Sequence, residues 1–447
     1  MKTARIILLF LLTTSLAFAQ SKLVVGYYPS WTSKVSYPYT SIPFRNLTHI
    51  AHAFIFPQSD GTLDLTGFTF YPELIQAAHL NGVGVVISVG GYDVARTPRF
   101  AQVAADPAAR TRFANALRDF CVTYQYDGVD IDWEYPTAGG RANTTLFYQA
   151  LRTALSSAGM PLTLSIAGGS TDGNAYDWTI MNGLLDWVGV MTYDFYGSWS
   201  PWKAGPNSPL YGSYDASSTG SIQASVADYR SKGVSSSKLL IGTPFYGWQF
   251  NATSVYGACT TASQKSYSAI APLTQQGWTR SVDAKAHVPF LVNSTQTSVV
   301  SYDDSISIGE KMKYVKDQGI GGTIIWALGQ DTGQQSLLRA VSLGLGLTTG
   351  IPEQRTESVP RSFELLQNYP NPFNGQTHIR YVVTNAGRYS LRVYDLLGRQ
   401  VEKLVDTEHQ PGSYQVSYSS ESLPSGVYVY RLSGEGVTVM RTMIVLR

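Results

Sequence analysis

The segment from Asp127 to Glu134 reads Asp-Gly-Val-Asp-Ile-Asp-Trp-Glu and places three acids at alternate positions. Side chains alternate sides along a β-strand, so Asp130, Asp132 and Glu134 are predicted to share one face. Neighbours in this row have Cα atoms about 6.7 Å apart, which is two strand rises. At an effective dielectric of about 20, two carboxylates at that spacing repel by roughly 2–3 kcal/mol, or about two pKa units. We therefore expect the three acids not to be ionised together at neutral pH.

Two ordinary explanations compete with a catalytic one: an exposed edge strand with incidental acids, and a calcium-binding loop. The alternate positions Val129, Ile131 and Trp133 are apolar, which argues against an exposed strand. A calcium loop would hold more oxygen ligands and fewer apolar residues. The pattern therefore favours a catalytic site built from crowded carboxyl groups.

Hydrolysis of a glycosidic bond normally uses two carboxyl groups that flank the bond. Here the acids lie side by side on one strand, so no second carboxylate is placed behind the anomeric carbon. Glu134, at the rim, is the candidate acid for the leaving oxygen, and we expect Asp132 to raise its pKa. The nucleophile could come from the substrate, as a 2-acetamido group that closes onto its own anomeric carbon. Asp132 would then hold the acetamide N–H, and Asp130 would share a proton or hydrogen bond with Asp132.

Eight short, apolar, β-rich segments alternate with helical patterns before residue 330, which is typical of an α/β fold of the (β/α)8 barrel type. The expected strands are 23–28, 48–56, 83–89, 127–133, 162–167, 186–193, 238–245 and 322–328. The expected helices are 72–80, 110–122, 144–156, 221–231, 307–316 and 333–343. The rival, a doubly wound open sheet, would have a Gly-rich phosphate turn after an early strand, which the sequence lacks. Barrel enzymes place reactive residues at the carboxyl ends of strands, where Glu134, Tyr193, Asp194 and Trp326 fall.

The alternation is interrupted between residues 250 and 299 by a segment too long for an ordinary loop. We expect a short insertion after strand 7, forming a small lobe or a wall beside the mouth of the barrel. The barrel domain is predicted to cover 20–347, and 348–362 reads as a polar, Pro-containing linker. Residues 363–447 predict a small all-β, Ig-like sandwich. Its expected strands are 377–383, 389–394, 412–418, 427–432 and 437–445.

The amino-terminal residues 1–19 have the layout of a secretory signal peptide, with Lys2 and Arg5 before an apolar run and Ala17-Phe-Ala19 after it. That run is too short to span a bilayer, and no later stretch is long enough. We expect export to the periplasm, a mature chain from about Gln20, and no membrane anchor. The formal net charge of +2, without a basic stripe, argues against nucleic acid as a partner. We expect a monomer that needs no metal and no cofactor.

The chain has two cysteines, Cys121 and Cys259. Cys121 falls near the end of the helix that leads into the acidic strand, and Cys259 falls in the insertion. These positions predict opposite faces of the barrel, so we expect two separate thiols rather than a disulfide.

The chain resembles the family 18 glycoside hydrolases, the chitinase family, over about residues 21–346. The motifs that carry this resemblance are Asp127-Gly-Val-Asp-Ile-Asp-Trp-Glu134 (D-x-x-D-x-D-x-E), Ser88-Val-Gly-Gly91 (S-x-G-G), Met191-Thr-Tyr-Asp-Phe195 (M-x-Y-D) and Trp326. The resemblance implies that Glu134 is the acid/base, that Asp132 is the acetamide partner and that Tyr193 steadies the acetamide oxygen. It also implies that Met191, Asp194 and Trp326 line the sugar pocket. Further expected contacts come from Tyr27, Trp31, Trp199 and Tyr246, and from Gly90 and Gly91, which permit close backbone approach.

Two positions depart from the family pattern. Tyr92 stands where many relatives carry Trp, and Trp248 stands where many carry Arg. Trp202, like Trp31 and Trp199, could be an ordinary wall residue. These departures put chain-length preference and binding mode in question, but not the reaction.

Residues 363–447 resemble the sorting domain of the type IX secretion system. The motifs concerned are Asn368-Tyr-Pro-Asn-Pro-Phe-Asn374, Val393-Tyr-Asp-Leu-Leu-Gly-Arg399 and Ser425-Gly-Val-Tyr-Val-Tyr-Arg-Leu432. The resemblance implies an address that the export machinery reads, with a destination outside the cell or on its surface. A fibronectin-like spacer is the alternative.

The leading functional hypothesis is a secreted, retaining endo-chitinase that acts on β-1,4-linked N-acetylglucosamine in chitin or its oligosaccharides. An endo-β-N-acetylglucosaminidase acting on N-glycans or peptidoglycan is an alternative, because the same acidic strand serves both. The alternative of another class is an inactive chitin-binding lectin. Such proteins usually lose the terminal acid, and Glu134 is intact.

Overall fold

The computed structural model describes residues 22–31, 36–158, 163–199, 202–213, 220–347, 363–368, 371–374, 376–410, 412–419, 423–434 and 436–446. The predicted signal peptide (1–19) and linker (348–362) lie outside these residues. The chain divides into two compact units, Met1–Ile351 and Pro352–Arg447.

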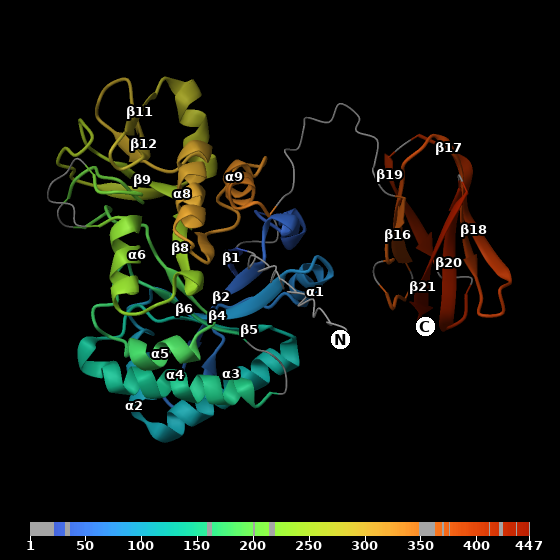
Figure 1. The fold of residues 1–447 in the computed structure, drawn as a ribbon, viewed down its shortest axis with the longest axis horizontal. Coiled ribbons are helices and arrows are strands. Elements are labelled where there is room, and N and C mark those ends of the chain that lie inside the picture. The colour runs from blue at the N-terminus through green and yellow to red at the C-terminus, as the bar shows by residue number, and fades with distance from the viewer. Residues whose placement is uncertain are drawn as a thin grey trace, which may run out of the picture. The chain divides into compact units, whose positions relative to one another are not determined.

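The first unit is built on eight strands that are parallel to one another and neighbour in the order β1-β14-β8-β7-β6-β5-β4-β2, within the described residues. Strand β1 also pairs with β2, so the sheet closes on itself (Figure 1). The strands are β1 (Leu23–Pro29), β2 (His49–Pro57), β4 (Gly84–Gly90), β5 (Gly128–Asp132), β6 (Thr163–Gly168), β7 (Trp187–Val190), β8 (Leu239–Pro244) and β14 (Gly322–Trp326). Each expected barrel strand is present, with bounds close to those predicted except for β7, which is shorter.

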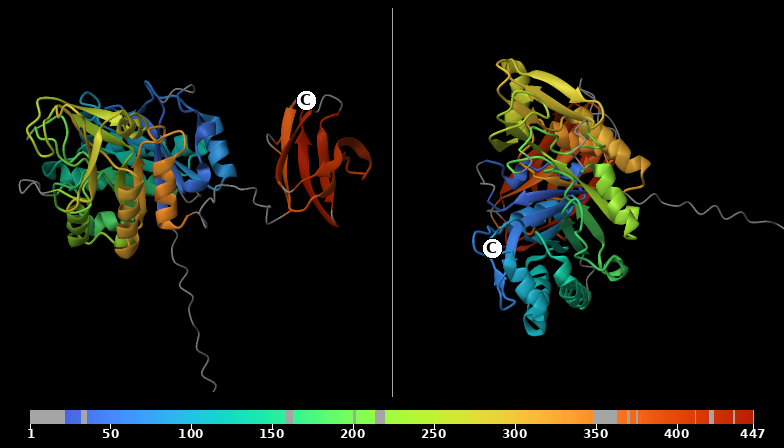
Figure 2. Two further views of the ribbon diagram at one scale, coloured as in Figure 1. Left: turned by 90° about the horizontal axis from the view of Figure 1, so that it is seen from above. Right: turned by 90° about the vertical axis from the view of Figure 1, so that its left-hand side faces the viewer.

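Helices lie on the outside of these strands in all three views (Figures 1 and 2). They are α1 (Pro72–Leu80), α2 (Pro98–Ala105), α3 (Pro107–Tyr124), α4 (Arg141–Ser156), α5 (Trp178–Leu184), α6 (Ile222–Ser231), α8 (Ser305–Asp317) and α9 (Ser336–Leu345). Short 3-10 helices are η1 (Tyr39–Ser41), η2 (Phe44–Asn46), η3 (Ala138–Gly140), η4 (Ser236–Lys238) and η5 (Ala271–Gln276). The prediction missed α2 and α5, which are short. It also began α3 too late, because Pro107 starts this helix and Asp106 caps it by accepting from the amides of Ala108 and Ala109.

Side chains of a barrel strand point alternately to the outer core and to the interior of the barrel, and β5 is buried along its whole length. Val129 and Ile131 of β5 belong to the core cluster packed between strands and helices. Asp130 and Asp132 therefore face the interior of the barrel, where both are buried. The predicted alternation is confirmed for these four residues.

The insertion between β8 and β14 forms a five-stranded antiparallel sheet with the order β10-β9-β13-β12-β11. Its elements are β9 (Tyr246–Phe250), β10 (Ala262–Ser266), α7 (Tyr267–Ile270), β11 (Thr279–Asp283), β12 (Val288–Val292) and β13 (Val299–Ser301). This lobe, yellow in Figures 1 and 2, follows the seventh barrel strand as expected. A two-residue strand, β3 (Leu63–Asp64), pairs antiparallel with β2.

Both cysteines are buried free thiols. Cys121 Sγ lies 3.6 Å from the carbonyl oxygen of Gly128, the first residue of β5. Cys259 packs in the core of the insertion lobe. The two side chains thus lie in different parts of the first unit, as predicted.

In the second unit, the described residues form two antiparallel sheets, one of order β15-β16-β19 and one of order β18-β17-β20-β21. The strands are β15 (Glu364–Leu365), β16 (Gln376–Val383), β17 (Gly387–Tyr394), β18 (Gln400–His409), β19 (Gly412–Ser419), β20 (Gly426–Gly434) and β21 (Val437–Val445). Both sheets contribute to one core, with Ile379 from one and Leu391 from the other. The all-β prediction is confirmed, and the Ig-like topology stays a prediction. The prediction missed β18, whose charged and mostly partly exposed sequence is typical of an edge strand.

Among the helices that the structure describes, none combines the length and the apolar character needed to cross a bilayer.

Candidate active site

A cleft of about 930 Å³ opens where the barrel strands end. Residues at or just beyond the carboxyl ends of all eight described barrel strands line it, which is where a barrel enzyme carries its active site. The predicted site residues that line it are Tyr27, Trp31, Gly90, Gly91, Asp132, Glu134, Met191, Tyr193, Asp194, Trp199, Tyr246 and Trp326. Trp202 and Asp130 are not among the lining residues.

Asp130 lies beneath the cleft, on the inner face of β5, and is 2% exposed. Its Oδ2 accepts a hydrogen bond from Tyr27 Oη and another from Ser88 Oγ, each at 2.7 Å. Ser88 stands beside Asp130 in the register of β4 against β5. This carboxylate is thus fixed by two hydroxyl groups from neighbouring strands and supports the site from below.

Asp132 ends β5 and is 3% exposed. Its Oδ1 is buried and has no hydrogen-bond partner among the described residues. Burial raises the pKa of Asp132 well above its usual value, and the charges of Glu134 and Asp130 raise it further. The backbone approaches closely here: the amide of Gly91 donates to the Asp132 carbonyl at 2.7 Å, and a Cβ on Gly90 would lie 2.0 Å from that oxygen. Only glycine fits at position 90 without moving the strand.

Glu134 lies two residues beyond the end of β5 and is half-buried. Burial raises its pKa to about 7, and the charge of Asp194 acts in the same direction, while a hydrogen bond with Tyr135 opposes it. The predicted direction is therefore confirmed. Burial is the largest cause, the predicted repulsion between Asp132 and Glu134 is present, and the charge of Asp194 is a further cause that the sequence did not indicate.

The Tyr193–Asp194 pair lies in the loop after β7, which ends at Val190 rather than at the predicted residue 193. Asp194 has φ = 58°, in the left-handed region. Its Oδ1 accepts hydrogen bonds from Tyr246 Oη at 2.7 Å and from Trp248 Nε1 at 2.8 Å. Burial raises the pKa of Asp194, although these two donors lower it.

Burial also raises the pKa of Tyr193 well above its usual value, helped by the charges of Asp132, Asp194 and Glu134. The Tyr193 hydroxyl therefore stays protonated and can donate a hydrogen bond to a ligand. Its neighbours place it among the three carboxyl groups of the cleft floor.

Aromatic rings form the walls of the cleft. Trp326 is stacked on Phe54, with ring centroids 5.7 Å apart and planes at 12°, and it also packs against Tyr27 and Trp31. Trp199 meets Trp248 edge to face at 5.3 Å. Flat, partly exposed faces such as that of Trp31, which is 59% exposed, suit contact with sugar rings.

Sequence reasoning missed several lining residues. These are Ser30, Phe54, Phe56, Thr66, Gly67, Asp93, Arg96, Tyr135, Gly169, Ser170, Ser198 and Gln264, whereas Tyr92 and Trp248, which the sequence had singled out as departures from the family pattern, also line the cleft. Phe54 and Phe56 end the second expected strand, so the strand-end rule could have found them. Arg96 pairs with Asp93 at 2.8 Å and lies over the Phe56 ring, and no motif signalled this contact.

Comparison with known proteins supports both resemblances. Residues 23–331 match the protein-family model described as "Glycosyl hydrolases family 18", and residues 367–446 match that described as "Secretion system C-terminal sorting domain". The chain therefore carries a type IX sorting domain after the barrel unit.

Among curated proteins, Chitinase A1 of Niallia circulans is 31% identical over 432 residues, which cover 76% of this chain and 61% of that protein. The chain thus spans less than two thirds of the length of this relative. Among solved structures, catalytic domain 2 of the Group II chitinase of Ostrinia furnacalis has a TM-score of 0.68 and 25% identity, covering 74% of this chain and 98% of that one. Chitinase ChiA74 from Bacillus thuringiensis has a TM-score of 0.67 and 22% identity, and the match covers 95% of this chain and 85% of that one.

The first family model matches more than half of the chain, and it includes the acidic row, the cleft and the whole of the closed sheet. The chain therefore belongs to family 18 of the glycosyl hydrolases.

Proposed function

We propose that this protein is a secreted, retaining chitinase that hydrolyses β-1,4 linkages of N-acetylglucosamine by substrate-assisted catalysis. One observation carries the proposal: the buried, unpartnered Oδ1 of Asp132 lies on the strand that leads to Glu134, whose pKa is raised to about 7. A buried acceptor without a partner costs about 1–3 kcal/mol, and an acetamide N–H would satisfy it.

The chemistry begins with Glu134, which is largely protonated below neutral pH and gives its proton to the leaving glycosidic oxygen. The acetamide carbonyl oxygen of the same sugar attacks the anomeric carbon as the glycosidic bond breaks. Asp132 accepts the acetamide N–H and stabilises the positive ring that forms, while Tyr193 donates to the acetamide oxygen. Water then attacks the anomeric carbon, Glu134 takes its proton, and two inversions leave the configuration retained.

The other carboxylates near the cleft are poorly suited to act as a nucleophile. Asp194 Oδ1 already accepts from Tyr246 and Trp248, and Asp130 lies below the cleft, bonded to two hydroxyl groups. This leaves the acetamide group of the substrate as the best-placed nucleophile. The proposal therefore restricts the substrate to N-acetylated sugars.

Internal cleavage of a polymer is the second part of the proposal. Exposed aromatic residues follow barrel strands on both sides of β5, with Tyr92 after β4 and Trp199 after β7. A sugar chain can thus find stacking surfaces in both directions from Glu134. The names of the relatives, chitinases in each case, support chitin as the polymer.

The sorting domain supports the location. We propose that the protein crosses the periplasm and reaches the cell surface or the exterior through the type IX machinery, which reads residues 363–447. A chain without these residues should accumulate in the periplasm with its specific activity intact, as measured by fractionation and assay.

The activity is tested with purified protein on chitin oligosaccharides, an N-glycoprotein and peptidoglycan. We expect cleavage of the chitin oligosaccharides, β-configured first products by NMR, and inhibition by a thiazoline that mimics the cyclised acetamide. Glu134→Gln should lower kcat by about 10²–10⁴-fold while leaving oligosaccharide binding. Preferred release from the N-glycoprotein or peptidoglycan would favour the endo-β-N-acetylglucosaminidase, and binding without cleavage would favour the lectin.

A further inference from the structure

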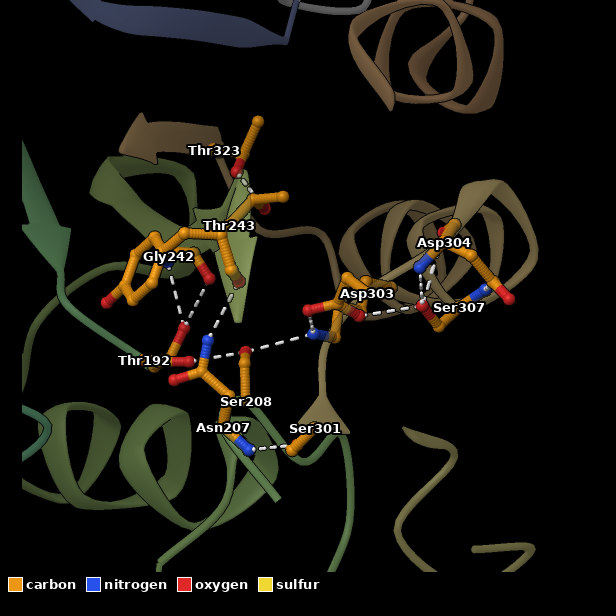
Figure 3. A network of polar contacts seen from close by, with 12 residues as sticks. Thr192, Asn207, Ser208, Gly242, Thr243, Ser301, Asp303, Asp304, Ser307 and Thr323 are labelled. Atoms are coloured by element: carbon orange, nitrogen blue, oxygen red, sulfur yellow. Dashed lines mark hydrogen bonds and ion pairs between the residues drawn. The ribbon is translucent and has the colours of Figure 1, made fainter. Parts of the chain in front are cut away.

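Two consecutive residues outside the cleft, Asn207 and Ser208, hold the loop that carries Tyr193 and Asp194. Both are 0% exposed. Figure 3 shows them between Thr192 on one side and Ser301 and Asp303 on the other. Nothing in the proposed chemistry uses them, and neither lines the cleft.

Asn207 is bonded at four points. Its Oδ1 accepts from the amide of Asp194 at 3.0 Å, and its carbonyl oxygen accepts from the amide of Phe195 at 3.2 Å. Its Nδ2 donates to the carbonyl oxygen of Tyr246 at 3.1 Å, and its amide donates to Ser301 Oγ at 2.7 Å. One buried carboxamide thus joins the backbones of Asp194 and Tyr246, whose side chains are bonded to each other at 2.7 Å.

The backbone of Asp194 needs such support. Its φ of 58° lies in a region that residues with a Cβ seldom occupy, and such a conformation persists only where the surroundings hold it. The bond from the Asp194 amide to Asn207 Oδ1 is a direct constraint on this residue.

Ser208 holds the other end of the loop. Its Oγ donates to the carbonyl oxygen of Thr192 at 2.6 Å and accepts from Lys311 Nζ at 2.9 Å. The hydroxyl of Thr192 in turn bonds both the amide and the carbonyl oxygen of Gly242 on β8, at 2.9 Å each (Figure 3). Tyr193 therefore lies between two backbone positions, Thr192 and Asp194, that are held by Ser208 and Asn207 from farther along the same β7–α6 connection.

We propose that Asn207 and Ser208 are positioning residues for the catalytic centre: they fix the backbone of residues 192–194 so that the side chains of Tyr193 and Asp194 meet the substrate. This inference rests on the proposed function. It assigns no contact with substrate to either residue. Asn207 and Ser208 are themselves held in place by hydrogen bonds to Ser301 on β13 and to the buried Lys311 on α8, respectively.

A positioning role differs from plain stabilisation in what it predicts for the pH profile. The charge of Asp194 helps to raise the pKa of Glu134. If the loop relaxes and Asp194 moves away, the pKa of Glu134 falls, and the alkaline limb of the profile moves to lower pH. Loss of stability alone leaves that limb in place, provided that the assay is run well below the unfolding temperature.

The test compares Asn207→Ala and Ser208→Ala with Asn46→Ala in the full-length protein. Asn46 is a matched control, because it is also a buried asparagine (3% exposed), it accepts from Ser342 on α9, and it does not line the cleft. We expect kcat/KM on a chitin oligosaccharide to fall about 10- to 100-fold in both loop variants, mainly through kcat. We also expect the alkaline limb to shift to lower pH in these two variants and not in Asn46→Ala.

Thermal unfolding first establishes that each variant is folded at the assay temperature. If Asn207→Ala is not folded, Ser208→Ala, which keeps the carboxamide, decides. Wild-type kcat/KM and an unmoved alkaline limb in the folded loop variants would overturn the positioning role while leaving the proposed function intact. If the wild type itself binds but does not cleave the oligosaccharide, the proposed function fails. The role of the loop is then judged by oligosaccharide affinity, which should be weaker in the loop variants than in Asn46→Ala, and equal affinity would refute it.

Discussion

Two of the buried carboxyl groups of the barrel unit, Asp132 and Asp303, have opposite surroundings. At the end of β5, Asp132 is 3% exposed and keeps one oxygen without a partner. At the start of α8, Asp303 is 2% exposed, pairs with Lys311 Nζ at 2.6 Å and accepts from Ser307 Oγ at 2.7 Å. Burial raises the pKa of both acids, but for Asp303 the cation opposes this effect, whereas for Asp132 the charges of Glu134 and Asp130 add to it.

The difference indicates how a buried carboxyl group that serves the structure can be told from one that binds a ligand. In the Asp303–Lys311 pair each charge has its partner within the fold, so the group is complete without a ligand. At Asp132 the fold retains a penalty of about 1–3 kcal/mol that a hydrogen-bond donor from a ligand would relieve. An incomplete buried carboxylate in a cleft is thus a better indicator of a substrate site than burial or a raised pKa alone.

Breaking the complete pair should give the largest effect on stability. Lys311→Met leaves Asp303 buried without its cation, and we expect a loss of about 3–5 kcal/mol in the free energy of unfolding at pH 7. The pKa of Asp303 rises further in the variant, so its native state gains protons relative to the unfolded state and the deficit grows as the pH rises. Denaturant unfolding at several pH values measures both.

Lys313→Met is the matched control, because it makes the same substitution on the solvent side of the same helix, where Lys313 pairs with Asp317 at 72% and 53% side-chain exposure. An exposed pair contributes about 0–1 kcal/mol. Equal losses in the two variants would contradict the contrast between a complete buried pair and a surface pair.

Much of the fold and of the candidate site could be predicted, because the signals are local in sequence. The two-residue period of Asp130, Asp132 and Glu134 fixed their face, and the strand-end rule placed Glu134 and Trp326 at the cleft. The eight barrel strands read as apolar runs since both of their faces are covered. Each of these inferences needs only a window of a few residues.

The missed features depend on contacts between distant segments. A lysine inside an amphipathic helix normally reads as a solvated residue, and Lys311 is buried with two partners, Asp303 just before its helix and Ser208, which is 103 positions away. The charge of Asp194, which helps to raise the pKa of Glu134, comes from a different segment, the loop after β7. The length and composition of a loop do not predict where its side chains will lie. Neither the Lys311–Ser208 contact nor the closeness of Asp194 to Glu134 could therefore be predicted from the sequence.

A second prediction sharpens the contrast at the incomplete site. Asp194→Asn removes the charge that helps to raise the pKa of Glu134, so that pKa falls from about 7 toward its usual value. The acid must be protonated to act, and the alkaline limb of the kcat/KM profile should therefore move to lower pH by about one unit or less. Asp228→Asn, on the outer helix α6, serves as a control that should leave the limb unmoved. An unmoved limb in Asp194→Asn would show that the charge of Asp194 does not contribute to the raised pKa of Glu134.

The smallest expected effect is a gain in the free energy of unfolding in Glu134→Gln, whereas Lys311→Met should cause a loss. The pKa of Glu134 rises from 4.5 to about 7 on folding, so between these values the native state holds more protons than the unfolded state, and this group makes the protein less stable as the pH rises. Glu134→Gln removes the ionisation, and we expect a gain of about 1 kcal/mol above pH 7 that vanishes below pH 4.5, after allowance for partial exposure. Denaturant unfolding at the two extremes measures it. An equal gain in stability at both pH values would mean that the ionisation of Glu134 is not the source of the gain. A loss of stability at high pH would show that the fold stabilises the ionised Glu134, as Lys311 stabilises the ionised Asp303.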